Sequence, residues 1–493
     1  MLLNLKRVVP ENTFCFVLIQ IFSTLSFAVL YSTLVLFITN KLGMSEHFAN
    51  NLTGIFLALH FVLNLLGGFI GGRFISYRNL FLVGVLLECI GILVVSSSTL
   101  SSLFVGLSIF LAGSGLYVTS LNCILTQQFE KNKSHNRETA FYWVYSGMNI
   151  GFLIGYSLSG WFTHTNNYSS LFILASLSSI IAMLIFVLNW SRMKDKETPI
   201  IRLPAQKQKQ RTTLSIFFII FLIPLIMVMM SHSNLSNELV LLIGISMLLV
   251  LFAFSYKQKK NEDRRKILAF LSLLIAALVF WSLYYIGPMG MTLFIKTHVN
   301  RDIRGFNIPI QWFNNINTLI IIIGPLLAKY FNHLRSKGLK LAVPTQFTIG
   351  LFFIGLAYIV LMVSIKAASS SISISPYSII FYYLLQSIGE LFISPIGYAM
   401  VGTLAPTNLQ GIMMGTWMLI SGVASTVAQY FSNIMITPSE SSGDNINAFM
   451  QSFGLLGASA LICSLLLFLL IPSLNKLMGI TGNSNENKLS YAS

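Results

Sequence analysis

Fourteen apolar runs, each about as long as a helix that crosses a bilayer, constrain this chain more than any other feature. Hydrophobic residues make up 55% of the 493 residues and charged residues only 9%, whereas an average soluble domain carries about 25% charged residues. A soluble domain cannot bury so much apolar surface. The composition therefore argues against a soluble enzyme or a nucleic-acid-binding protein, and it predicts that the chain's main partner is a lipid bilayer.

Polar, charged or Pro- and Gly-containing breaks separate the runs. Because lipid offers the backbone no hydrogen-bond partners, such runs must be helical, and we expect an all-α membrane protein. The first run is too long for a cleaved signal peptide. We predict membrane-spanning helices over residues 13–39, 47–72, 79–98, 102–128, 139–163, 169–191, 213–231, 238–256, 267–295, 307–331, 341–365, 377–403, 410–436 and 447–472.

Basic residues lie mostly on one side of these spans. Lys and Arg residues number 31, and when they are assigned to alternate sides, the poorer side holds only Lys41, Lys296, Arg301, Arg304 and Lys366. Cytoplasmic loops are enriched in Lys and Arg, so this bias predicts that both termini are cytoplasmic. It also accounts for the net charge of +16 without any nucleic acid.

The spans follow a 6+2+6 pattern. This pattern predicts an N-terminal six-helix bundle (1–191), cytoplasmic linkers with an inserted two-helix hairpin (192–266), a C-terminal six-helix bundle (267–472) and a cytoplasmic tail (473–493). Two six-helix bundles around a central cavity are the architecture of the major facilitator superfamily, in which one half rocks against the other. We therefore expect a major facilitator fold with 14 transmembrane helices.

Several segments resemble motifs of one family within that superfamily, the proton-dependent oligopeptide transporters. Residues 67–73 (GGFIGGR) resemble the superfamily's cytoplasmic loop motif. The inserted hairpin is also a feature of that family's bacterial members. The segments that resemble the family itself are 145–151 (YSGMNIG), 308–317 (IPIQWFNNIN), 389–397 (GELFISPIG), 403–406 (TLAP) and 410–417 (QGIMMGTW).

The chain departs from this family at its charged positions. The family carries a Glu-x-x-Glu-Arg motif and a second Arg in span one, a Lys in span four and an acidic residue in span seven. When the spans are counted as in that family, without the inserted hairpin, only the acidic residue of span ten is retained, as Glu390. The matching positions here are neutral: Gln20, Ser23 and Thr24 at the span-one motif, Tyr31 at the second Arg, Val118 at the Lys and Tyr285 at the acidic position of span seven.

Ionisable residues deep inside the spans can be counted without reference to the family. Of the 15 acidic residues, only Glu88 and Glu390 lie deep in a span. Of the seven histidines only His60 does, and none of the Lys and Arg residues does. Charges inside a bilayer are costly and usually mark a pathway or a relay. We therefore name Glu390, Glu88 and His60 as candidate proton-relay groups.

The resemblance implies that Glu390 holds the amino group of a solute. A carboxylate in a low-dielectric cavity attracts an ammonium strongly. The alternative is a protonated Glu that is hydrogen-bonded to a neighbouring helix. The family also places Asn149 and Asn317 at the solute's peptide backbone, whereas the alternative for these amides is hydrogen bonding between helices.

Aromatic residues complete the predicted solute-binding set. By resemblance, Tyr31 and Trp417 line pockets for the solute, and Tyr117, Tyr145 and Tyr285 are weaker members of the set. The alternative for all five is packing. His60 and Glu88 lie at similar depth on consecutive antiparallel spans, so they could form a titratable pair; the alternative is a structural pair or two unrelated polar groups.

We predict a secondary active transporter of peptide-like or amine-bearing solutes in a bacterial inner membrane. It is expected to work by alternating access and to be proton-linked. No buried cation is predicted to meet a carboxylate, so free dipeptides should bind poorly. The alternatives are an uncoupled facilitator or exporter of a modified peptide or siderophore-like metabolite, and a non-transporting sensor.

No P-loop, metal-ligand cluster or nucleophile–base pair occurs, so we expect no enzyme, cofactor or metal. We expect a monomer.

Overall fold

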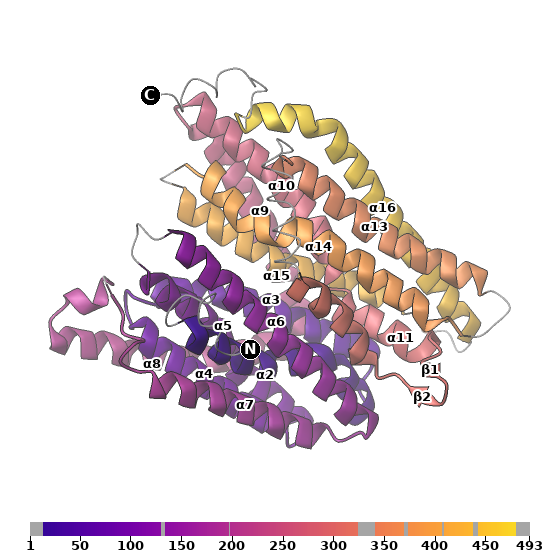
Figure 1. Cartoon of the computed structure of the whole chain (residues 1–493), viewed down its shortest axis with the longest axis horizontal. Coiled ribbons are helices and arrows are strands. Elements are labelled where there is room, and N and C mark those ends of the chain that lie inside the picture. The colour runs from indigo at the N-terminus through magenta and orange to yellow at the C-terminus, as the bar shows by residue number, and fades with distance from the viewer. Residues whose placement is uncertain are drawn as a thin grey trace.

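The computed structural model describes residues 13–129, 134–196, 198–323, 341–368, 373–406, 409–436 and 442–479. Nearly all of these residues are helical (Figure 1). The sheet in this part of the chain is a small antiparallel hairpin between β1 (Asp302–Ile303) and β2 (Phe306–Asn307). The fold is therefore all-α, as predicted.

Helices of the first half follow the order of the predicted spans. They are α2 (Thr13–Leu36), continued by the π-helical η1 (Phe37–Lys41), α3 (Glu46–Ile70), α4 (Tyr77–Val95), α5 (Leu100–Gln127), α6 (Ser134–His164) and α7 (Tyr168–Leu188). A linker with one 3-10 turn, η2 (Ile200–Arg202), leads to the hairpin helices α8 (Ala205–Ser231) and α9 (Ser233–Lys257).

The second half begins with a span in three pieces. These are α10 (Asn261–Tyr284), the π-helical η3 (Gly287–Met291) and α11 (Thr292–His298). The next helix starts as the 3-10 turn η4 (Ile310–Phe313) and continues to residue 323. It is followed by α13 (Val343–Ala367), α14 (Pro376–Leu404), α15 (Gln410–Ile434) and α16 (Ser442–Leu477).

Each of the fourteen predicted spans coincides with a helical segment, although residues 324–331 of the tenth lie outside the described residues. The main difference lies at the helix ends. The helix α8 starts at Ala205 and α10 at Asn261, several residues before the apolar runs that begin at 213 and 267. Hydropathy marks only the part of a helix that lies in lipid, and polar first turns continue the same helix into water.

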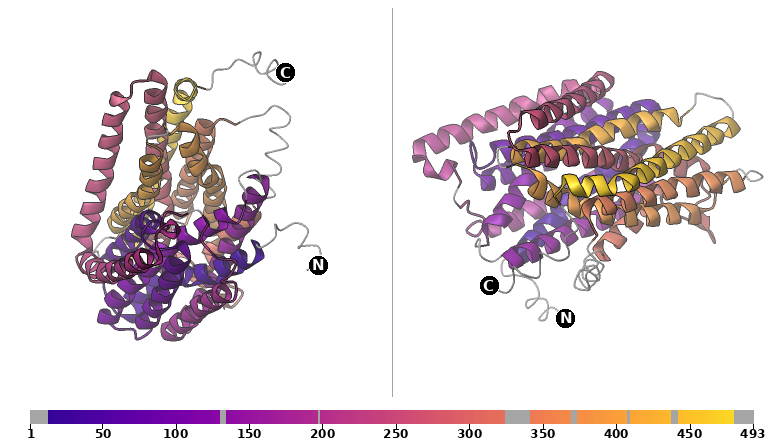
Figure 2. Two further views of the ribbon diagram at one scale, coloured as in Figure 1. Left: turned by 90° about the vertical axis from the view of Figure 1, so that its left-hand side faces the viewer. Right: turned by 90° about the horizontal axis from the view of Figure 1, so that it is seen from above.

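The helices form two bundles and a hairpin, which is the major facilitator architecture. In the first bundle α4 packs against α5 and α7, α2 against α6 and α7, and α3 against α5. In the second, α13 packs against α14 and α16, and α10 against α15. Figure 1 shows the first bundle (indigo to purple) below the second (orange to yellow). The bundles meet where α3 packs on α15 and α6 on η4, and α9 packs on α10, α15 and α3. Figure 2 shows the molecule from two further sides.

A network of neutral amides joins the bundles and the hairpin at the end opposite the basic linkers. Asn51 on α3 is its centre, because its Oδ1 accepts from Gln429 and from Asn433 Nδ2 (2.6 Å) on α15. Its Nδ2 donates to Asn234 Oδ1 on α9 (2.5 Å). Asn50 Nδ2 donates to Asn433 Oδ1 (3.1 Å). This end of the molecule is thus held by hydrogen bonds between uncharged groups.

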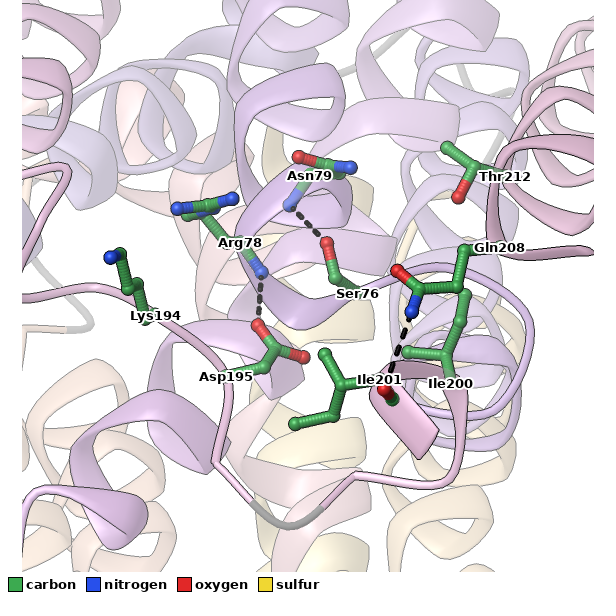
Figure 3. Close-up of a pocket in the computed structure, with 9 residues that line it drawn as sticks. All are labelled: Ser76, Arg78, Asn79, Lys194, Asp195, Ile200, Ile201, Gln208 and Thr212. Atoms are coloured by element: carbon green, nitrogen blue, oxygen red, sulfur yellow. Dashed lines mark hydrogen bonds between the residues drawn. The ribbon is translucent and has the colours of Figure 1, made fainter. Parts of the chain in front are cut away.

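A surface pocket at the basic end of the first bundle, drawn in Figure 3, is lined by the linker after α7, the start of α4 and the first turns of α8. The Asp195 carboxylate accepts hydrogen bonds from the backbone N–H groups of Tyr77 (2.8 Å) and Arg78 (3.1 Å), so it caps the start of α4. Gln208 Nε2 on α8 donates to the Ile201 carbonyl (3.2 Å). These bonds anchor the hairpin to the first bundle.

Candidate functional site

A small cavity lies between the two bundles at the point where α2, α6, α10 and α14 come together. The first bundle contributes aromatic groups, and the second contributes tyrosines, amides and the unwound backbone of η3. The residues that line it are Tyr31 and Tyr156 from the first bundle and Tyr284, Gly287, Asn314, Asn317, Tyr383 and Gln386 from the second.

Glu390 on α14 lies in the wall behind this lining and is only 6% exposed. Its Oε2 accepts a hydrogen bond from Asn317 Nδ2 at 2.7 Å. The same amide nitrogen donates to Ser387 Oγ (3.1 Å), and the Tyr284 hydroxyl donates to Asn317 Oδ1 (3.4 Å). The Nδ2 and Oδ1 atoms of Asn317 therefore both take part in hydrogen bonds, and these fix the orientation of its N–H toward the carboxyl group of Glu390.

Gln386 offers a second acceptor one helical turn before Glu390. Its side chain lines the cavity, is 3% exposed, and its Oε1 has no hydrogen-bond partner. A buried oxygen without a donor raises the free energy of the empty site by roughly 1–3 kcal/mol. A solute with an N–H group can remove this cost, so the second-bundle wall favours a solute rich in donors.

The charge of the cavity is one-sided. Among the residues that the structure describes, no lysine or arginine is buried, and the buried acidic residues are Glu88 and Glu390. An ionised carboxylate in such surroundings has no cation to compensate its desolvation. An ammonium about 4 Å away would gain roughly 4 kcal/mol at an effective dielectric constant near 20. The Glu390 group is therefore arranged to bind either a cationic group or a proton.

Aromatic rings form the opposite wall. The ring of Tyr31 lies 6.3 Å from that of Tyr156 and 6.0 Å from that of Phe27, measured between centroids. Tyrosines give a cavity apolar faces together with hydroxyl groups that can donate or accept. This wall can hold the apolar part of a solute but supplies no positive charge.

Three of the predicted site residues come together here, namely Tyr31, Asn317 and Glu390. Asn149 does not line this cavity. It is 4% exposed, and its Nδ2 donates to the carbonyl of Tyr145 one turn earlier in its own helix (2.9 Å). The Tyr145 side chain is 36% exposed. For these two residues a contact with solute remains a prediction.

Three other predicted aromatic residues pack inside the protein. Tyr117 on α5 is buried within the first bundle. Trp417 on α15 lies against Gly397 of α14 so closely that a Cβ atom on that glycine would overlap the indole ring. The Tyr285 ring stacks on that of Trp281, with centroids 5.8 Å apart. Roles for these residues in solute binding also remain predictions.

His60 and Glu88 have different neighbours. The His60 ring stacks on Phe27, with centroids 4.3 Å apart, and its Nδ1 lies 3.4 Å from Ser114 Oγ. Glu88 lies among hydroxyl groups, of which that of Tyr117 is one. The geometry therefore gives no support to a titratable pair, and each group has to be considered separately.

Six lining residues were not predicted from the sequence. Spacing could have identified four of them, because each lies one or two helical turns from a predicted residue on the same face. Gln386 and Tyr383 lie four and seven residues before Glu390, Asn314 lies three before Asn317, and Tyr156 lies seven after Asn149. Tyr284 and Gly287 carry no such signal. Tyr284 faces Asn317 where α10 ends and the helix changes pitch into η3.

Comparison with known proteins identifies the family. The family model described as POT family matches residues 78–451, which is more than half of the chain. The chain belongs to the POT family. The resemblance of residues 145–151, 308–317 and 389–397 predicts this family, and the prediction is confirmed.

Relatives cover nearly the whole length of this POT-family chain. It is 26% identical over 474 residues to the dipeptide and tripeptide permease B of Xenorhabdus bovienii, covering 95% of this chain and 96% of the permease. It is also 26% identical to the dipeptide and tripeptide permease A of Cronobacter turicensis, covering 95% and 93%. Both relatives are permeases rather than enzymes.

Solved structures share the fold. A crystal structure of a mutant of the peptide transporter POT in complex with alafosfalin superposes with a TM-score of 0.82 at 23% identity, covering 95% of this chain and 96% of that one. A POT-family transporter in complex with 5-aminolevulinic acid gives a TM-score of 0.80 at 20% identity, covering 94% and 97%. The two-bundle architecture with its central cavity is thus the fold of this family.

Proposed function

We propose that this protein moves small peptide-like solutes that carry a free amine but no free carboxylate, by alternating access across a bacterial inner membrane. The two bundles supply the moving halves, and the cavity between them supplies the binding site. One observation carries the proposal: the cavity borders the Glu390 carboxyl group, and no lysine or arginine is buried among the described residues. Both termini are proposed to be cytoplasmic, on the side rich in basic residues.

A free dipeptide brings an ammonium and a carboxylate into the same site. Glu390 can neutralise the first, while Gln386 Oε1 and the tyrosine hydroxyls can meet N–H groups of the peptide bond. No buried cation among the described residues can neutralise the second, and removing one partner of a buried ion pair costs about 3–5 kcal/mol. The site therefore favours amidated or otherwise masked peptides, and other amines, over free dipeptides.

Energy coupling follows from the same carboxyl group. Glu390 can be neutralised by the ammonium of a solute or by a proton, but not by both at once. Proton and amine therefore compete, and the affinity for a cationic solute rises with pH until Glu390 is fully ionised. When a proton replaces the amine at Glu390, or an amine replaces the proton, the movement of solute is coupled to the movement of protons.

Counterflow in liposomes tests this proposal. The solutes are a radiolabelled dipeptide amide, its N-acetyl derivative, which lacks the ammonium, and the free dipeptide, each measured at several pH values. We expect exchange of the amide only, with the apparent affinity rising as pH increases. Equal exchange of the N-acetyl derivative, or an affinity independent of pH, would contradict the assigned role of Glu390.

A further inference from the structure

Glu88 is the second buried acidic residue, and the proposed transport function does not use it. It lies in the middle of α4, is 0% exposed, and does not line the solute cavity. A Cβ atom on Gly113 of α5 would overlap the backbone nitrogen of Glu88, so the two helices touch at this point. The carboxyl group is enclosed by α2, α4, α5 and α7, inside the first bundle.

Hydroxyl groups from three other helices face this carboxyl group. They belong to Ser26 on α2, Tyr117 on α5 and Ser179 on α7. Neither carboxyl oxygen, however, has a partner within hydrogen-bond geometry. The titratable groups nearest to Glu88 in the described residues are Tyr117 and the adjacent Cys89. The group therefore has neighbours but no bound donor and no cation.

Each of these hydroxyl groups has a hydrogen-bond partner other than Glu88. The Tyr117 hydroxyl donates to the Ser23 carbonyl (3.1 Å), and the Ser26 hydroxyl lies 2.9 Å from the Ala175 carbonyl that can accept from it. Ser26 Oγ also lies 2.6 Å from Ser179 Oγ and 3.2 Å from Ser178 Oγ, and either oxygen can be the donor in these two contacts. Each hydroxyl oxygen near Glu88 retains capacity to accept a further hydrogen bond.

This arrangement disfavours an ionised carboxylate, which would be buried with no hydrogen bond to its oxygens and no buried cation among the described residues. A protonated carboxyl group fits, since it brings its own hydrogen to hydroxyl oxygens that can accept it. We propose that Glu88 is a proton-binding site within the first bundle, separate from the solute cavity. The proton takes the place of the missing donor and lets α2, α4, α5 and α7 pack together.

A bound metal ion such as sodium is the competing occupant of an oxygen-rich cluster. The observations favour the proton, because Ser26 and Ser179 are hydrogen-bonded to each other at 2.6 Å and the carboxyl group is fully enclosed. A cation coordinated by these oxygens would have to separate them. The test below therefore includes sodium as one of its arms.

Infrared difference spectroscopy of the purified full-length protein in nanodiscs tests the proposal directly. The C=O stretch of a protonated carboxyl group is recorded at neutral pH for the wild type and for Glu88→Gln and Glu390→Gln. We expect Glu88→Gln to remove one carboxyl band that Glu390→Gln retains. An unchanged carboxyl region in Glu88→Gln would overturn the proposal, and so would a band in the wild type that disappears when sodium is added at constant pH.

Thermal unfolding across pH provides a second measurement. Glu88→Gln keeps the shape of the protonated group, so it should fold and match the wild type at neutral pH. As pH rises the wild type should lose stability, because an ionised Glu88 has no donor, whereas the variant should lose less. Parallel pH profiles would contradict the proposal.

Matched serine variants separate this site from general packing. Ser179→Ala removes a hydroxyl that faces Glu88, and Ser176→Ala removes a buried hydroxyl of the same helix, which donates to the Ile173 carbonyl (2.7 Å). We expect Ser179→Ala to shift the Glu88 carboxyl band and Ser176→Ala to leave its frequency unchanged. Equal spectra for both variants and the wild type would show that the serine cluster does not bind the proton.

Discussion

The two buried glutamates differ in what surrounds them. Glu390 in the second bundle accepts a hydrogen bond from Asn317 and lies behind the wall of a cavity that reaches both bundles. Glu88 in the first bundle is fully enclosed, and neither of its carboxyl oxygens has a hydrogen-bond partner. The carboxyl group of Glu390 therefore has a donor that stabilises its ionised form, and that of Glu88 has none.

This difference suggests distinct roles for residues of the same type. A carboxylate with a fixed donor beside the solute cavity can exchange its counter-ion, so we propose that Glu390 alternates between proton and amine. A carboxyl group without donors or access retains its proton as part of the packing. The four predictions below test this contrast, beginning with the largest effect.

Glu390→Gln should weaken binding of a dipeptide amide to the purified protein by about 100-fold, because the ammonium loses the buried counter-charge that borders the cavity in the described part of the chain, at a cost of about 3 kcal/mol. Isothermal titration calorimetry measures the change. The matched control is Glu238→Gln, which makes the same substitution at an exposed position of α9. Comparable losses in both variants would remove Glu390 from the solute site.

Tyr31→Arg places a cation on the aromatic wall of the cavity, which has no positive charge of its own. A carboxylate on the solute then gains a partner, and we expect the ratio of affinities for free dipeptide and dipeptide amide to rise about tenfold, or about 1.4 kcal/mol. Competition against a labelled amide measures this ratio. An unchanged ratio in a folded variant would show that Tyr31 does not face the carboxyl end of the solute.

Asn317→Leu removes the donor that orients Glu390. The carboxyl group keeps its charge but loses one charge-assisted hydrogen bond, so solute affinity should fall about five- to tenfold, less than in Glu390→Gln. Binding should also become more sensitive to acid, since the ionised form has lost its donor. Asn189→Leu, at the end of α7, is the control; an effect of the same size there would indicate a general loss of structure.

The fold could be predicted almost completely from the sequence, because hydropathy and charge asymmetry are one-dimensional signals. All fourteen spans coincide with helical segments, and the errors lie at polar ends such as Ala205. The site could be predicted only in part. Tyr31, Asn317 and Glu390 were found, but Tyr284 faces the site only because α10 gives way to η3 after it.

The environment of Glu88 could not have been predicted. Its depth in the span was evident, and pairing with His60 was a reasonable expectation from their similar depth. Which hydroxyl groups reach it depends on the rotation of α2, α5 and α7, and on the close approach of α5 at Gly113. Where a hydroxyl donates its hydrogen is a property of tertiary packing alone.

Tyr117→Phe should have the smallest effect and should separate the two glutamates. It removes one acceptor near Glu88 and one bond to the Ser23 carbonyl, so stability should fall by about 1 kcal/mol. Solute affinity should stay within about twofold, a change below 0.5 kcal/mol, because the ring lies outside the cavity. Denaturant or thermal unfolding gives the first value and calorimetry the second. A large change in affinity would show that the Glu88 cluster is connected to solute binding.

The most direct test of the central claim is the ratio of dissociation constants for a dipeptide and its C-terminal amide, measured on the purified wild-type protein at one pH. The claim is that the cavity presents one carboxyl group and no buried cation. It predicts that the amide binds at least about tenfold more tightly, a difference of about 1.4 kcal/mol. Equal or tighter binding of the free dipeptide would contradict it.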